Sequence, residues 1–389
     1  MKNCFIFAGE ASGDLHGSRL MRNLKEQFIF SSLNGVGGPL MRLEGLEVLY
    51  PMEEFQVMGF TDVLKAFPKL YKLFYAIRKH ILKTNPSCVI LIDYPGFNLR
   101  LTKSLRKGGY KGKIIQFICP TVWAHGKKRI DTMVKHLDLL LTIYPFEAAF
   151  FSHTPLKVRY VGNPLVETVS NYPYKENWKS ICGIPHNQKL LAIFPGSRIG
   201  EIQRHFPQQL EVAQLLIKNH PSIHFAISCS DDSLLSFIKT HIDNTSLQMG
   251  LNIHLVPRSF SYELMKDCHC SLAKSGTVTL ELALHQKPTV VLYTLTQLNY
   301  LLAKYWMHLN LPHYCIVNIL RGRTVYPEFI GKKLDIYQIF KQIEKLFINQ
   351  DHYDSVIGDC ATLRQQLGDS IASSLASREI QELLNAKKT

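Results

Sequence analysis

The stretch CFIFAGEASGDLHG, residues 4–17, joins a short apolar run to a glycine-containing turn and then to a helix-like segment. The apolar run at residues 4–8 predicts a buried strand, and the pattern at residues 15–25 predicts a helix. Gly9 and Gly13 permit positive φ angles or the close approach of another backbone segment. A strand, a tight turn and a helix in this order are typical of the first unit of a doubly wound α/β fold.

The turn itself carries two carboxylates and a serine, which are Glu10, Asp14 and Ser12. Two negative charges would repel a phosphate, and the turn contains no Gly-x-Gly-x-x-Gly motif. Two interpretations therefore stay open. Ser12 or Asp14 caps the following helix, or Glu10 accepts hydrogen bonds from hydroxyl groups, as a sugar site requires.

The remaining sequence repeats strand and helix patterns in two sets. Expected strands of the first set are residues 4–8, 88–93, 113–119, 137–142 and 158–161, and those of the second are 190–194, 224–228, 252–256, 270–273 and 289–293. These near-continuous apolar runs are typical of parallel strands buried on both faces. A polar, proline-containing connection at 163–187 separates the sets. We predict two doubly wound, Rossmann-like α/β domains, residues 1–165 and 166–345, that face a cleft, with C-terminal helices at 346–389.

Composition excludes several classes of protein. A chain of 389 residues with 46% hydrophobic and 20% charged residues is globular and long enough for two domains. No apolar run reaches the ~18 residues of a membrane span, and residues 4–8 are too short for a signal-peptide core, which favours a cytoplasmic protein.

The nine cysteines lack framework spacing and are typical of reduced thiols. Cys268 and Cys270 have no second pair nearby, so a buried strand is favoured over a zinc site.

Positive charge is concentrated in the first half of the chain. Residues 1–165 carry 23 lysines and arginines against 12 acidic residues, whereas residues 166–389 carry 22 against 19. Such a balance predicts a polyanionic partner, either nucleic acid, anionic lipid or a phosphorylated substrate. Nucleic acid is disfavoured because the sequence lacks interleaved stacking aromatics and a recognised nucleic-acid-binding fold.

The segment at residues 57–83 combines aromatic and basic side chains. Pro68 suits the start of a helix, and a broad apolar face follows it at positions that include Leu70, Leu73, Phe74 and Ile77. One interpretation is an interfacial helix on an anionic membrane, and the other is a core helix with a basic outer face. The charge of this half and the aromatics on several sides favour the membrane.

Polar residues follow the strands where a doubly wound fold binds ligands. Asp93 ends a buried strand and is placed to act as a general base, or it caps the helix that starts near Asn98. Pro195-Gly196-Ser197-Arg198 ends another strand, and backbone amides at a helix start together with a guanidinium favour a phosphate site over a solvated turn.

A second turn of the same kind is Ser275-Gly276-Thr277, which opens a helix with free amides. Glu281 lies one turn further along, where it either accepts hydrogen bonds from ribose hydroxyls or is a glutamate on the buried face of a capped helix. Acid-bearing turns in the first half and phosphate-type turns in the second predict divided roles. The second domain binds a nucleotide, and the first binds hydroxyl groups and supplies a base.

Six motifs occur along the chain in the order AGEASGDLHG, IDYPGFN, PTVWA, FPGSR, SGTVTLE and VNILRGRTVYPE. Together they resemble the lipid-A-disaccharide synthases, glycosyltransferases of family 19 with the GT-B fold, across residues 3–375. The resemblance implies transfer of 2,3-diacylglucosamine from UDP to 2,3-diacylglucosamine 1-phosphate (lipid X), with inversion. It implies no cofactor and no metal, and the sequence contains no Asp-x-Asp metal motif.

The resemblance also implies residue roles. Asp93 corresponds to the base that deprotonates the acceptor hydroxyl, and Arg198 to the arginine that binds the diphosphate. Positions implied to contact the UDP-sugar are Ser275, Gly276, Thr277, Glu281, Asn318, Arg323 and Glu328. Acceptor-side positions are Glu10, Ser12, Asp14 and Trp123, and membrane- or acyl-facing positions are Phe67, Leu70, Leu73, Phe74 and Ile77. His125 stands near where the family usually has a second tryptophan, so it is either a loop residue or a second proton-transfer group.

The implied partners are UDP-2,3-diacylglucosamine, lipid X and an anionic inner-membrane surface, with no nucleic acid. The implied location is peripheral, on the cytoplasmic face of the inner membrane of a Gram-negative-type bacterium, and the final helices are expected to cross back to the first domain. Acyl-chain length and a homodimer are left open. The alternatives are a soluble UDP-sugar epimerase or another GT-B enzyme, which would not need the basic aromatic segment, and a catalytically inactive membrane scaffold.

Overall fold

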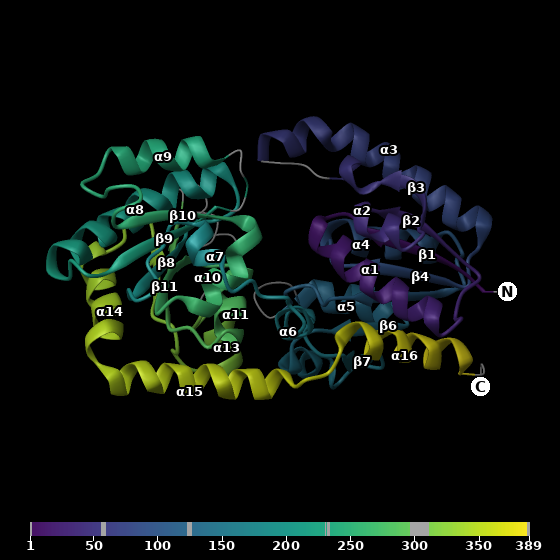
Figure 1. Cartoon of the computed structure of the whole chain (residues 1–389). Helices are drawn as coiled ribbons and strands as arrows, with labels where there is room; N and C mark the ends of the chain where they lie inside the picture. The colour runs from purple at the N-terminus through teal and green to yellow at the C-terminus, as the bar shows by residue number, and fades with distance from the viewer. Residues whose placement is uncertain are drawn as a thin grey trace. The chain divides into compact units, whose positions relative to one another are not determined.

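The computed structural model describes residues 2–55, 60–122, 127–229, 231, 234–295 and 311–386. The chain divides into two compact units (Figure 1). Unit 1 comprises Met1–Glu167 and Asp369–Thr389, and unit 2 comprises Thr168–Gly368. The first unit is therefore built from both ends of the sequence.

Unit 1 contains a parallel sheet of seven strands in the order β3-β2-β1-β4-β5-β6-β7. Its strands are β1 (Asn3–Ala8), β2 (Ser32–Gly37), β3 (Glu47–Pro51), β4 (Cys88–Ile92), β5 (Lys113–Phe117), β6 (Leu139–Thr142) and β7 (Lys157–Tyr160). The central strands are continuous apolar runs because helices cover them on both sides. The direction in which strands are added reverses between β1 and β4, and ligands of such sheets bind at that point, beyond the carboxyl ends of the strands.

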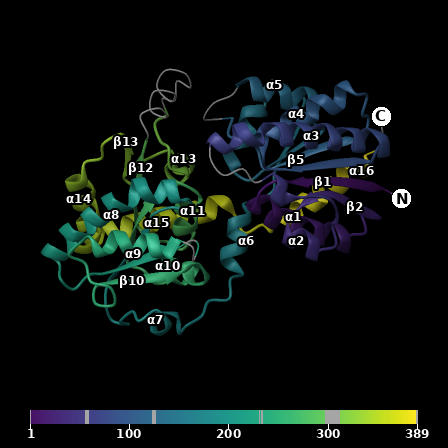
Figure 2. The same cartoon turned by 90° about the horizontal axis from the view of Figure 1, so that it is seen from above.

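Helices of unit 1 lie on both faces of this sheet (Figure 2). One face packs against α1 (Ala11–Glu26), α2 (Pro39–Leu43) and α16 (Ala372–Asn385), and the other against α3 (Phe60–Thr84), α4 (Pro95–Lys107) and α5 (Lys127–His136). The strand pleat separates the two cores, since Cys4 and Ile6 enter the first whereas Phe5 and Phe7 enter the second. Shorter elements are η1 (Met52–Glu54), η2 (Pro145–Phe151) and α6 (Pro164–Ser170).

Unit 2 repeats this plan with six parallel strands in the order β10-β9-β8-β11-β12-β13. The strands are β8 (Leu190–Phe194), β9 (His224–Cys229), β10 (Ile253–Pro257), β11 (Cys270–Lys274), β12 (Thr289–Thr294) and β13 (Glu328–Gly331). One face packs against α8 (Ile199–Asn219), α9 (Leu235–Asp243) and α14 (Ile336–Ile348), and the other against α7 (Trp178–Ile181), η4 (Arg258–Phe260), α10 (Ser261–Asp267) and α11 (Thr277–Leu284). Helices α13 (Ile316–Arg321) and α15 (Gln350–Leu367) contact α11. The equivalent switch point lies between β8 and β11.

The final helices divide between the units. Helix α15 belongs to unit 2, and only the part of residues 346–389 from Asp369 onward belongs to unit 1. There α16 packs along α1, with Ala376 and Ile380 fully buried in the sheet core. The side-chain amide of Asn23 donates to the Ser373 hydroxyl at 3.2 Å. One helix therefore returns to the first unit rather than the whole C-terminal block.

The two predicted doubly wound sheets are confirmed, but β2, β3 and β13 were not expected from the sequence. Strands β3 and β13 are short and lie at sheet edges, where apolar runs are not required. Strand β2 contains Gly35, whose φ is 147° and where a Cβ atom would lie 2.0 Å from the carbonyl oxygen of Ile6. Only glycine fits this close approach, and a strand interrupted by glycine does not give a continuous apolar signal.

The expected start of the basic aromatic helix at Pro68 is wrong. Helix α3 begins at Phe60 and contains Pro68 in its interior. Pro68 is exposed, so the hydrogen bond that proline cannot donate is missing on the solvent side of the helix, where water can satisfy the carbonyl group. Among the described residues, no helix is both long enough and apolar enough to cross a membrane.

Candidate functional site

The first candidate site lies at the carboxyl ends of β1 and β4, at the switch point of unit 1. Glu10 follows β1 and Asp93 follows β4, and both line one pocket of about 550 Å³. The other lining residues are Phe67, Leu70, Tyr71, Phe74, Tyr75, Tyr94, Pro95, Gly96, Phe97 and Arg100. The pocket thus places two carboxylates and one guanidinium against a largely aromatic wall. Arg100 was not expected from the sequence, where it is one basic residue among many on a helix.

Asp93 and Tyr94 hold the strand-to-helix turn in an uncommon backbone conformation. Their φ angles are 49° and 46°, in the left-handed region that non-glycine residues rarely adopt. The amide of Asp93 donates to the carbonyl of Phe117 at 2.9 Å. The carbonyl of Asp93 accepts hydrogen bonds from the side chains of Gln116, at 3.0 Å, and Asn98. Strain of this kind persists where neighbouring groups fix the turn, and it is typical of functional sites.

The environment of the Asp93 carboxyl suits a general base. Burial raises its pKa above the ordinary value, and a hydrogen bond from the Tyr94 amide partly opposes that shift. A carboxylate with a raised pKa holds a proton more strongly, so it can accept one from a hydroxyl group during a reaction. Burial also raises the pKa of the Tyr94 phenol, and the nearby Glu10 charge adds to the shift. The Tyr94 hydroxyl donates to the carbonyl of Phe55 at 2.9 Å.

Helix α3 supplies the aromatic wall. Phe67, Tyr71 and Tyr75 are 56%, 54% and 47% exposed and follow one another at successive turns of the helix. Phe74 contacts Phe97 with a ring-centroid separation of 5.4 Å, and Phe97 stacks on Phe7 in the core at 4.7 Å. The wall therefore runs from a solvent-exposed aromatic row to the buried centre of unit 1.

Two of the residues predicted to face membrane or acyl chains are core residues instead. Leu73 is 8% exposed and Ile77 is fully buried, and both pack against the sheet. Because a helix places residues three and four apart on one face, Leu73 and Ile77 share the side turned toward the strands. Phe67, Leu70 and Phe74 line the pocket. The face that carries Leu73 and Ile77 fits the core-helix interpretation, whereas the membrane interpretation stays a prediction for the exposed face.

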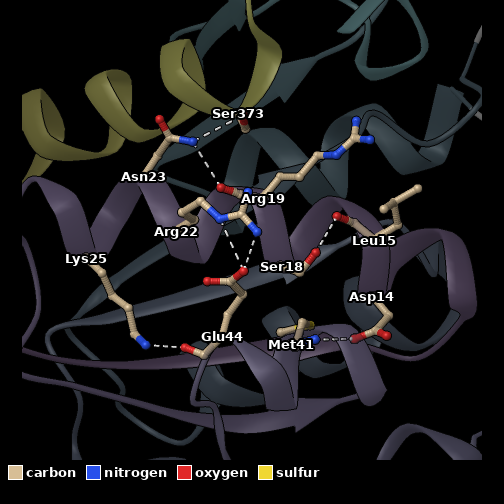
Figure 3. A network of polar contacts seen from close by, with 10 residues as sticks. All are labelled: Asp14, Leu15, Ser18, Arg19, Arg22, Asn23, Lys25, Met41, Glu44 and Ser373. Carbon is tan, nitrogen blue, oxygen red and sulfur yellow. Dashed lines mark hydrogen bonds and ion pairs between the residues drawn. The ribbon is translucent and has the colours of Figure 1, made fainter. Parts of the chain in front are cut away.

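The assignment of Asp14 to the acceptor side is corrected by the structure. Asp14 is 2% exposed, and its carboxylate accepts hydrogen bonds from the backbone amides of Gly38, Leu40 and Met41, at 2.8, 3.0 and 3.0 Å. These amides open α2, as the close view of the Asp14–Met41 bond shows (Figure 3). Asp14 therefore stabilises the start of a helix. Ser12 is exposed on the first turn of α1, and Glu10 alone of the three lines the pocket.

Two further residues singled out from the sequence, Trp123 and His125, lie outside the described residues. Their predicted roles on the acceptor side and in proton transfer stay predictions.

The second candidate site lies at the carboxyl ends of β8 and β11, the switch point of unit 2. Arg198 occupies the N-terminal cap of α8, and Gly276 occupies that of α11. Arg198 is exposed and forms no ion pair within the described ranges, so its guanidinium is available to an anion. Gly276 and Thr277 are also exposed, beside half-buried Ser275. Two helix N-termini and one cation at neighbouring strand ends make an arrangement suited to phosphate groups.

Glu281 lies one turn into α11. It accepts a hydrogen bond from the Tyr262 hydroxyl at 2.8 Å. Burial raises the pKa of the Glu281 carboxyl, and the Tyr262 bond partly offsets this. A fixed carboxylate at this position can accept hydrogen bonds from neighbouring hydroxyl groups of a ligand.

The predicted nucleotide cluster after residue 316 is brought together only in part. Glu328 accepts from the backbone amides of Tyr314 and Cys315 at 2.9 and 3.0 Å and lines a pocket of about 320 Å³. Asn318 is fully buried, and its side chain bonds to Glu328 and to the backbone of residues 325–326. Asn318 therefore has no polar atom left for a ligand, and its role is to shape the loop.

Arg323 makes its ion pair with a residue outside this cluster. Its guanidinium pairs with Asp359 on α15, which also binds Arg321 at 3.1 Å. Its assignment to the nucleotide is therefore not supported by its contacts. Conversely, His313 lies 3.7 Å from Glu328 and was not expected from the sequence. No local pattern in the sequence marks it.

The two sheets and their switch-point sites define the class of protein. Solved structures of this arrangement include a UDP-GlcNAc 2-epimerase from Neisseria meningitidis bound to UDP-GlcNAc, with a TM-score of 0.60, 13% identity and 99% coverage of each chain. The kitacinnamycin glycotransferase has a TM-score of 0.62 and 11% identity, with 98% coverage of each chain. At these identities the likeness shows the fold alone, which is the GT-B fold with two Rossmann-like units.

Sequence similarity is more specific. A family model described as lipid-A-disaccharide synthetase matches residues 4–380. Curated lipid-A-disaccharide synthases from Chlamydia pneumoniae, Chlamydia trachomatis serovar D and Geobacter metallireducens are 42%, 39% and 34% identical, over 86%, 95% and 100% of this chain. The chain belongs to the lipid-A-disaccharide synthase family.

The relatives differ in length. The chain spans 55% of the Chlamydia pneumoniae protein and 61% of the Chlamydia trachomatis protein. It spans 98% of the Geobacter metallireducens protein.

Proposed function

We propose that the protein is an inverting glycosyltransferase that condenses UDP-2,3-diacylglucosamine with 2,3-diacylglucosamine 1-phosphate (lipid X). The products are the lipid A disaccharide 1-phosphate and UDP. The proposal rests on the position of Asp93 in this chain, which belongs to the lipid-A-disaccharide synthase family. This carboxyl group has a raised pKa and lies at a switch point, in a pocket with an aromatic wall. Such a pocket suits a sugar that carries acyl chains.

In the proposed reaction, the Asp93 carboxylate accepts the proton of the acceptor 6-hydroxyl. The acceptor oxygen forms a bond to C1 of the donor sugar as the bond from C1 to the UDP oxygen breaks on the opposite face, which inverts the configuration. Negative charge grows on the departing diphosphate. The Arg198 guanidinium and the N-termini of α8 and α11 stabilise that charge. No metal is required in this scheme.

The donor nucleotide is assigned to unit 2. Glu281 is held by Tyr262 and can accept hydrogen bonds from ribose hydroxyls. Glu328 is fixed by two backbone amides and lines its own pocket. These fixed carboxylates complement the exposed cation and helix N-termini, which suit the diphosphate.

The exposed face of α3 is assigned to an anionic membrane surface. Its aromatic row, Phe67, Tyr71 and Tyr75, is exposed beside exposed basic residues such as Lys72 and Lys79. Aromatic and basic side chains on one face are typical of helices that lie in the headgroup region of anionic lipids. Binding there would place the aromatic pocket next to the source of acylated substrates.

The test is product separation after incubation of purified protein with UDP-2,3-diacylglucosamine and radiolabelled lipid X, with and without EDTA. Wild-type protein should give a disaccharide spot in both conditions. Asp93→Asn should lose at least about a hundredfold in kcat, the usual contribution of a general base. UDP binding, measured by calorimetry, should persist in this variant. Asp131→Asn, which removes an exposed carboxylate on α5 of the same unit, is the matched control and should keep full turnover.

Three results would contradict parts of the proposal. Turnover of Asp93→Asn within a few-fold of wild type would remove Asp93 as the base. Absence of a disaccharide spot together with conversion of soluble UDP-GlcNAc would instead support a UDP-sugar epimerase. Loss of product with EDTA would show that a metal takes part.

A further inference from the structure

The two phosphate-type turns of unit 2 are joined by a half-buried ion pair that the proposed reaction does not use. The Lys274 ammonium, on the last residue of β11, lies 3.0 Å from the carboxylate of Glu201 on the first turn of α8. The two side chains are only 17% and 13% exposed. Because a charge buried to this extent requires a partner, neither group can leave the other without cost.

Glu201 is also bound to the turn that carries Arg198. One carboxylate oxygen accepts from the Ser197 amide at 3.3 Å, while the other accepts from Lys274. Gly196, with a φ of 122°, lets the carboxylate approach, because a Cβ atom there would lie 2.9 Å from it. The Glu201 side chain thus fixes the backbone of the residues directly before Arg198.

Lys274 reaches the second turn. A Cβ atom built on Gly276 would lie 3.7 Å from the Lys274 ammonium. The same ammonium lies 5.4 Å from the ring centroid of Tyr293, at the end of β12. The ion pair therefore spans three neighbouring strand ends.

His205 completes the connection on the buried side. One ring nitrogen lies 2.7 Å from the carbonyl oxygen of Glu201, to which it donates, and the other accepts from the Thr294 amide at 3.0 Å. This pair of bonds requires the neutral ring. Burial lowers the pKa of His205 to about 4, which keeps the ring neutral near pH 7.

We propose that Lys274 and Glu201 are positioning residues for the donor diphosphate. Their ion pair holds the Ser197–Arg198 turn and the Ser275–Gly276–Thr277 turn at a fixed separation. The inference rests on the proposed function, since it assumes that these two turns bind UDP. It assigns the Lys274 ammonium to Glu201 rather than to the diphosphate, and the Glu201→Gln variant tests that assignment.

UDP titration by calorimetry on the full chain tests the inference. Lys274→Met and Glu201→Gln should each weaken UDP binding about tenfold, and the double variant should show the same tenfold rather than a hundredfold loss, since the two residues act as one unit. In turnover assays KM for the UDP-sugar should rise while kcat changes by less than about threefold. Lys341→Met breaks the exposed Lys341–Glu344 pair of the same unit and is the control, with UDP affinity unchanged.

The Glu201→Gln variant separates positioning from direct contact. If Lys274 itself bound the diphosphate, releasing it from Glu201 would tighten UDP binding, and this result would overturn the inference. Lys274→Arg keeps the ion pair and the fold, so a tenfold loss in this variant would also overturn it. If wild type binds UDP but the variants bind equally well, only the inference fails. If wild type does not bind UDP, the proposed function fails with it.

Discussion

Replacement of Asp14 by alanine distinguishes a structural carboxylate from a substrate-binding one. The substitution removes the acceptor of three backbone amides at the start of α2. The bonds from Gly38 and Met41 are buried, so each amide left without an acceptor costs about 1.5–2 kcal/mol, whereas the part-buried Leu40 amide can reach water and costs about 0.5 kcal/mol. The free energy of unfolding of this region should therefore fall by about 4 kcal/mol.

Hydrogen exchange measured by mass spectrometry reports this change locally. Amides in the peptide that spans α2 should exchange about a thousandfold faster in Asp14→Ala, the rate ratio that corresponds to about 4 kcal/mol. Ser12→Ala, an exposed substitution on the same turn of α1, should leave exchange unchanged within about 0.5 kcal/mol. The reasoning fails if Asp14→Ala keeps α2 protected but loses turnover, because Asp14 would then act on the acceptor side.

Three other perturbations test separate parts of the structure. The free energy of unfolding should fall by about 3 kcal/mol as the pH is lowered from 6.5 to 4, because the histidine of the unfolded chain binds a proton near pH 6.5 whereas folded His205 does so only near pH 4. His205→Gln should remove this pH dependence in acid denaturation. Phe67→Ser combined with Tyr71→Ser should reduce co-sedimentation with phosphatidylglycerol vesicles about tenfold at unchanged Tm, whereas Ile77→Ser should lower Tm. Asn318→Ala leaves two buried amides without an acceptor and should cost about 3 kcal/mol in urea denaturation.

The sequence predicted the central strands and the two switch-point turns because both depend on local physics. A strand covered on both faces must be apolar along its whole length, and β4 and β8 are fully buried. Asp93 and Arg198 follow such strands directly, so their places at the carboxyl edge could be inferred once the strands were recognised. The identity of the sheet edges was not predictable in the same way, since β3 and β13 are half-buried.

Side-chain roles were harder to predict than positions. Asp14 and Glu10 occupy the same turn, yet one binds backbone amides of a helix 24 residues away in sequence and the other lines a pocket. Asn318 and Arg323 belong to one motif, but their partners lie on different elements. Such partners are set by tertiary packing, which spacing along the chain does not encode.

The Lys274–Glu201 pair shows a similar limit. Glu201 stands three residues after Arg198, a spacing typical of helix-capping glutamates. That signal indicates a bond to the turn, and the Ser197 amide provides it. Nothing in the spacing indicates that a lysine 73 residues later would share the same carboxylate.

Synthesis on the ribosome cannot complete unit 1 first, although this unit begins the sequence. Ala376 and Ile380 of α16 fill its sheet core, and they emerge only after the whole of unit 2 has been made. Domains generally fold as units during translation, the N-terminal one first. Here unit 2, a continuous segment, has all its residues available earlier, so we expect the nascent N-terminal sheet to keep an apolar face uncovered until the last helix arrives.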